Sequence, residues 1–67
     1  MRYDVVVGIG RDVEDAASAL RREVDNAIDG GWRPIGGVAI HECEPSPDSG
    51  QTFFEWVFAQ AMVSDRD

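Results

Sequence analysis

The sequence has no lysine, only one cysteine and no long hydrophobic run, and each of these shortages excludes a class of protein. The lone Cys43 cannot form a disulfide within the chain, and no apolar segment is long enough to cross a bilayer. Residues 1–4 are not followed by an apolar segment with a small-residue cleavage site, so we expect no signal peptide. The sequence therefore predicts a cytoplasmic protein without a membrane partner.

Basic residues are also few, and all of them are arginines. The net charge is −7, with 6 basic side chains against 13 carboxylates. Nucleic-acid affinity comes mainly from cations that displace condensed counterions, so this balance predicts no nucleic-acid partner. The simplest interpretation of the acidity is solubility, and mimicry of a nucleic acid to block a DNA-binding protein is the alternative.

The length of 67 residues predicts a single domain, 1–67, with a thin core. A chain of this size buries only about 60% of the surface that its unfolded form exposes. Ordering entropy of roughly 1.5 kcal/mol per residue opposes apolar burial worth about 25 cal/mol per Å², which leaves a lone monomer marginal. We therefore expect self-association, most simply a homodimer.

Hydropathy patterns predict an α+β fold in the order strand, helix, strand, strand. Asp12 is a natural N-cap of the helix, and the pair Gly30-Gly31 supplies the left-handed residue that ends it. The predicted elements are a strand at 3–9, a helix at 12–29, a strand at 35–41, a polar loop at 42–51 and a strand at 52–63.

These elements predict a three-stranded, mainly antiparallel sheet with the helix packed on one face. We favour the third strand in the centre, and an order with the first strand in the centre stays open. Pro34 indicates an edge strand or a bulge in the second strand. The following Gly36-Gly37 indicates either a bulge or a close approach by another backbone or an aromatic ring.

The third strand is apolar on both of its faces, although a half-buried surface strand would alternate with polar residues. One helix can cover only one face of the sheet, so the other face is expected to meet a second copy or another partner. One face of this strand carries Phe53, Val57, Ala59, Ala61 and Val63. We predict an interface between copies at the larger side chains, which are Phe54, Trp56, Phe58 and Met62.

Residues that could carry chemistry are sparse. His41 and Cys43 have a spacing that could contribute to a zinc site, but one histidine and one cysteine are too few for the usual four ligands. No third group marks a base for Cys43 as a nucleophile, and nothing places Glu42 and Glu55 together as an acid and base pair. We therefore predict no catalytic residue, no metal, no cofactor and no enzymatic activity.

The segment Gly8-Ile9-Gly10 resembles the start of a phosphate-binding turn, in which helix amides cradle an anion. A third glycine is missing at the expected offset, where Val13 stands, and the acidic first turn of the helix would repel a phosphate. A tight strand-to-helix turn is the preferred interpretation.

A small-molecule site is the more interesting alternative, because aromatic platforms with an arginine and an amide can hold a planar anion. The candidate residues are Tyr3, Trp32, Arg33 and Gln60. Packing in a core or an interface explains the tryptophans more simply. A real ligand, such as a nucleotide-like anion, is expected at a subunit boundary, where two copies build concavity.

Four segments together resemble a known family: residues 3–6, the helix residues around Leu20 and Val24, the centre 31–38 with its GW-x-P-x-GG pattern, and the QAMV ending at 60–63. The chain resembles the short bacterial and phage domains grouped as domain of unknown function 1737. The resemblance implies a compact strand-helix-strand-strand unit, with no established activity and no catalytic residues to carry over.

Three functions follow as hypotheses. The first is a non-catalytic binding or interaction module that forms a homo-oligomer through its sheet. The second is a binder or sponge for a small anionic ligand at the subunit boundary. The third is a phage-type inhibitor that binds a host protein through the acidic helix and the acidic loop 42–48.

Overall fold

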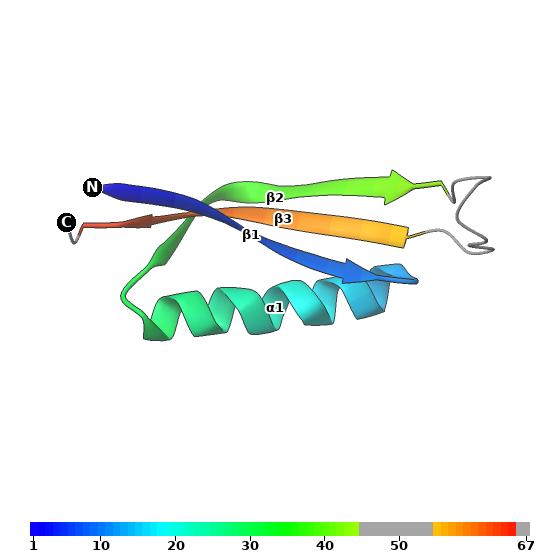
Figure 1. Ribbon diagram of the computed structural model, residues 1–67, viewed down its shortest axis with the longest axis horizontal. Helices are drawn as coiled ribbons and strands as arrows, with labels where there is room; N and C mark the ends of the chain where they lie inside the picture. Colours follow the sequence, from blue (N-terminus) through cyan, green and yellow to red (C-terminus); the bar gives the residue numbers. More distant parts are fainter. Residues whose placement is uncertain (45–54, 66–67) are drawn as a thin grey trace.

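The computed structural model describes residues 1–44 and 55–65, which form one three-stranded sheet with a helix on one face (Figure 1). The predicted α+β class and its β-α-β-β order are confirmed. Predicted strand residues 52–54 and predicted loop residues 45–51 lie outside the described part. The elements are β1 (Arg2–Gly10), α1 (Val13–Asp29), β2 (Arg33–Cys43) and β3 (Glu55–Ser64).

The third strand of the chain lies in the centre of the sheet, as predicted. The strand order is β1-β3-β2, and both outer strands pair antiparallel with β3. The crossover through α1 therefore leaves β1 and β2 parallel to each other, on opposite sides of β3. Both outer strands are longer than the patterns predicted, and β2 begins two residues early, at Arg33.

The glycine pair that follows α1 ends the helix in the way the sequence predicts. Gly31 has a positive φ of 94° and is the left-handed residue. The Trp32 N–H donates to the Ala27 carbonyl at 2.9 Å, and the Gly31 N–H donates to the Ile28 carbonyl at 3.0 Å. This is the Schellman arrangement, which satisfies helix carbonyls and turns the chain toward β2.

The start of α1 is capped by a side chain. The Asp15 N–H donates to Oδ1 of Asp12 at 2.8 Å, which satisfies one of the donors that a helix start leaves open. Glu14 and Asp15 add negative charge at the positive end of the helix dipole. The predicted N-cap is therefore confirmed.

The helix packs closely over β1 and β3 but hardly touches β2. Ala16 and Leu20 of α1 meet Phe58 of β3 in the core. Gly8 and Gly10 allow this approach, because a Cβ added at either position would collide with the backbone of α1. Both glycines lie within β1, where they permit close packing under the helix. The predicted tight turn from strand to helix follows directly, because α1 begins at Val13.

The second glycine pair forms a bulge. β2 is in register with β3 at Ile35 and again at Ala39, and three residues of β2 between them face a single residue of β3. Gly36 has a positive φ of 73°, a conformation that favours glycine. A Cβ added at Gly36 or Gly37 would have no described atom within 4 Å, so the bulge alternative is confirmed and close approach is not the reason.

Candidate functional site: an open sheet face and a groove

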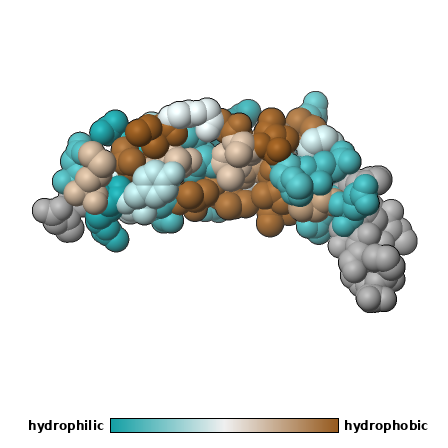
Figure 2. Space-filling model, turned by 90° about the horizontal axis from the view of Figure 1, so that it is seen from above, coloured by the Kyte–Doolittle hydropathy of each residue, from teal (hydrophilic) through white to brown (hydrophobic). Residues whose placement is uncertain are grey.

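The sheet face that points away from α1 is apolar and uncovered (Figure 2). Figure 2 views the molecule from the side opposite α1, and hydrophobic side chains run along the middle of this face with hydrophilic ones toward its ends. Five of its large apolar side chains are 42% to 67% exposed, whereas Val57 is half-buried and Val63, at one end of the face, is 3% exposed. The five exposed side chains are Tyr3, Val5, Val7 and Ile9 of β1 and Ile35 of β2.

The strand register explains how this open face is built. Val5 lies beside Ala61 and Val7 beside Ala59, so the bulky row on β1 adjoins a row of small side chains on the central strand. Among the described strand residues of this face, only Arg33 and Glu55 are charged, and they lie at opposite ends of it. The middle of the open face is therefore a continuous uncharged surface.

The structure corrects the predicted choice of interface face. Phe58 is 7% exposed and Met62 is 0% exposed, because both lie on the side of the sheet that α1 covers. Trp56 also packs against this core. Phe54, the fourth predicted interface residue, lies outside the described residues. The large side chains of β3 are thus used within the chain, and the unsatisfied apolar face is the opposite one.

The four predicted ligand residues do not form one site. Tyr3 and Arg33 flank Val63 on the open face, whereas Gln60 lies on the helix side of the sheet. The guanidinium carbon of Arg2 lies 5.4 Å from the centroid of the Trp32 ring, so an arginine of the chain itself occupies one face of this aromatic platform. The set therefore divides between two sides of the sheet.

Gln60 has a structural task that sequence reasoning missed. Its side-chain Nε2 donates to the carbonyls of Ile35 at 2.9 Å, Ala61 at 3.1 Å and Gly36 at 3.3 Å. The bulge interrupts the ladder at the Ile35 and Gly36 carbonyls of β2, and the amide binds them to the central strand. The sequence does contain a signal for this role, because an amide stands in the apolar strand β3 and a glycine pair stands in the neighbouring strand β2.

Replacing Gln60 by methionine should destabilise the fold by about 1 to 2 kcal/mol, because part-buried carbonyls lose their donor while the side-chain volume is nearly kept. Urea unfolding measures this loss. The exposed Asn26→Met change on α1 is the control and should stay within roughly 0.5 kcal/mol of the parent chain. Equal stability of the two variants would show that the amide does not hold the bulge.

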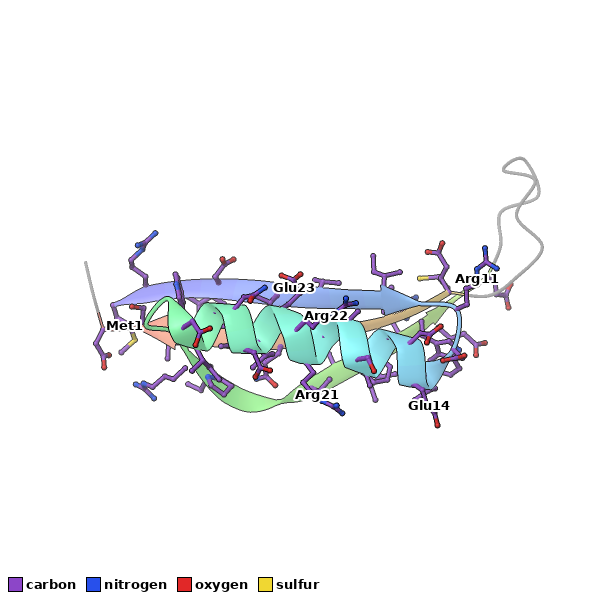
Figure 3. The ribbon with its side chains drawn as sticks, turned by 90° about the horizontal axis from the view of Figure 1, so that it is seen from below. Met1, Arg11, Glu14, Arg21, Arg22 and Glu23 are labelled. Carbon is purple, nitrogen blue, oxygen red and sulfur yellow. The ribbon has the colours of Figure 1, made fainter. Side chains whose placement is uncertain are left out.

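A groove separates α1 from β2, because the helix sits over β1 and β3. Its volume is about 340 Å³. Val38 and Ile40 of β2 point into the space that α1 leaves uncovered, and they are 46% and 58% exposed. Figure 3 shows Arg21 on the edge of α1 next to β2, at the rim of this groove. The remaining apolar lining consists of Ala17, Leu20, Val24 and Phe58.

The described residues hold no group of three or more histidine, cysteine and acidic side chains that could bind a metal ion. His41 and Cys43 lie two positions apart on the open face, near its Glu55 end. No helix within the described ranges is long and apolar enough to cross a membrane.

Comparisons of the chain with protein-family models, with curated proteins and with solved structures find no match. The resemblance to domain of unknown function 1737 therefore stays a prediction.

Proposed function

We propose that this chain is a non-catalytic interaction module that works as a homodimer, with the open faces of two sheets packed together and the two helices outside. The observation that carries the proposal is the row Tyr3, Val5, Val7 and Ile9, which stays exposed on the side of the sheet opposite α1. Large exposed apolar patches on small proteins mark interaction sites.

The size of the open face fits a dimer. Its five large side chains expose on the order of 500 Å², and the flanking alanine and polar side chains bring the area toward the ~800 Å² that each partner buries in a standard interface. Two such sheets would pack about 10 Å apart with their strands roughly aligned. The dimer would then have four layers, with a second apolar core between the sheets.

The shape of the open face supports self-association in particular. The bulky β1 row of Val5 and Val7 stands beside the shallow row that Ala59 and Ala61 form on β3. A twofold axis parallel to the strands can place β1 of each copy over β3 of the other. Each ridge then fills the opposite trough, which is the reciprocity that a symmetric dimer requires.

The thinness of the monomer core gives the energetic reason. The described apolar residues that are buried in one chain are Ala16, Leu20, Phe58, Met62 and Val63. Ala16 is small and Val63 lies at the end of the sheet, so both contribute little to the core. The free energy that a single chain gains from apolar burial is therefore small compared with the entropy it loses on folding. Packing the open faces would add apolar burial at no further cost in chain length.

Sedimentation equilibrium across a dilution series tests the proposal. The expected mass is twice the chain mass of 7.4 kDa at micromolar concentration. The unfolding midpoint should rise with protein concentration, because dimerisation stabilises the folded state by mass action. A folded monomer at every concentration, with a constant midpoint, would contradict the proposal.

A further inference from the structure

We propose that the groove between α1 and β2 binds an apolar molecule that carries one carboxylate, with its hydrocarbon part over Phe58 and its carboxylate on Arg21. The groove lies on the side of the sheet opposite the open face. The inference is therefore independent of the proposed dimer, and either can fail alone.

The lining of the groove sets the apolar part of the ligand. Leu20, Val24, Val38, Ile40 and Phe58 present hydrocarbon or aromatic carbon to a space of about 340 Å³. Small-molecule sites in proteins range from ~300 to ~1,000 Å³ and are mostly apolar, so this groove suits a ligand at the small end of the range. Its exposed Val38 and Ile40 side chains would gain cover from such a ligand.

The wall at Gln60 makes the groove a preformed feature. Gln60 is 6% exposed, and its amide nitrogen is held by the carbonyls of Ile35 and Gly36 in the bulge. Because this bulge fixes the course of β2 beside Val38, the distance between β2 and α1 is set before any ligand binds. A preformed site loses less affinity to reorganisation than a site that must be ordered.

Arg21 selects the charged group of the ligand. It is the cationic side chain of the lining, in a chain whose net charge is −7. No carboxylate of the described residues forms an ion pair with Arg21, so its guanidinium is available at the rim. A guanidinium presents parallel N–H donors that match the two oxygens of a carboxylate. An uncharged apolar ligand would make no ion pair with the Arg21 guanidinium.

Titration of the full chain with decanoate, below the concentration at which it forms micelles, tests the inference by calorimetry. We expect one decanoate per chain. Arg21→Gln should weaken decanoate binding by roughly two- to fivefold, the range for an exposed ion pair, and should leave binding of the uncharged 1-decanol unchanged. Arg22→Gln is the matched control, because Arg22 is the next residue of α1 and does not line the groove (Figure 3).

If the Arg21 and Arg22 variants weaken decanoate binding equally, the weakening comes from the change in net charge and the inference is wrong. An absence of decanoate binding would also overturn it. Amide chemical shifts locate the ligand: changes at Ala17, Val38 and Ile40 support the groove, and changes confined to Val5 and Val7 contradict it. If the groove amides of the ligand-free protein shift on dilution, a second copy fills the groove and the inference is wrong.

Discussion

Replacing Val7 by glutamate should convert the proposed dimer into monomers and weaken self-association by at least about 2 kcal/mol, the loss typical of a central interface residue. Val7 lies in the middle of the β1 row and is 42% exposed in the single chain. Its side chain points away from α1, so one chain can keep the carboxylate in water. In a dimer the same carboxylate would be buried without a partner, which is strongly unfavourable.

Sedimentation velocity of the Val7→Glu variant gives the readout, and unfolding at several protein concentrations checks whether the variant still folds. Ser18→Glu is the matched control, because Ser18 is exposed on α1 and the change adds the same charge elsewhere. The control should keep the parent mass. A folded Val7→Glu variant that sediments like the parent would show that the open face is not the contact.

Replacing Gly8 by alanine should destabilise the fold by about 3 kcal/mol or more, at the upper end of what overpacking costs. The added methyl group would collide with the backbone of α1 at Ala16 and Leu20. A flexible side chain could move aside, but these contacts are with backbone atoms. They can be relieved only if the whole helix moves away from β1 and β3. Urea unfolding measures the loss.

Gly37→Ala is the matched control for Gly8→Ala. Gly37 lies in the bulge of β2 and has a negative φ, and a Cβ there would meet no described atom within 4 Å. Its replacement should change the free energy of unfolding by less than roughly 1 kcal/mol. Similar losses in the two variants would mean that α1 does not pack against β1 closely enough to exclude a side chain at Gly8.

The order of the elements, the helix cap at Asp12 and the helix end at Gly31 could be predicted from the sequence, and the bulge at Gly36 was one of two alternatives. Each rests on a local rule, in which the residue type and its neighbours decide the backbone conformation. The central place of β3 also follows from a pattern, because a strand that is apolar on both faces is favoured in the middle of a sheet.

The face that α1 covers could not be read from β3 alone. Both faces of β3 are apolar, and the choice depends on how closely a helix can approach the neighbouring strand. Gly8 and Gly10 give the missing information, because they put two residues without side chains on one face of β1. The bulky row of β1 is left on the other face, which is the reverse of the usual expectation that large apolar side chains lie under the helix.

The groove and the role of Gln60 were beyond sequence reasoning for a related reason. The groove exists because α1 is displaced toward β1, a lateral shift that no hydropathy pattern specifies. From the sequence, Arg21 is one of several solvated charges on the helix, and only the structure places it in the same groove as the exposed Ile40 of β2. Gln60 resembles a ligand group in the sequence, whereas in the structure its amide donates to carbonyls at the bulge of β2.

The proposed packing of two open sheet faces is tested by an isotope-filtered NOE experiment on a mixture of ¹³C-labelled and unlabelled chains, which reports only contacts between copies. We expect intermolecular NOEs from the methyl groups of Val5, Val7 and Ile9 to the methyl groups of Ala59 and Ala61. Intermolecular NOEs confined to groove residues, or none in a sample of folded dimer mass, would contradict the packing of two open sheet faces.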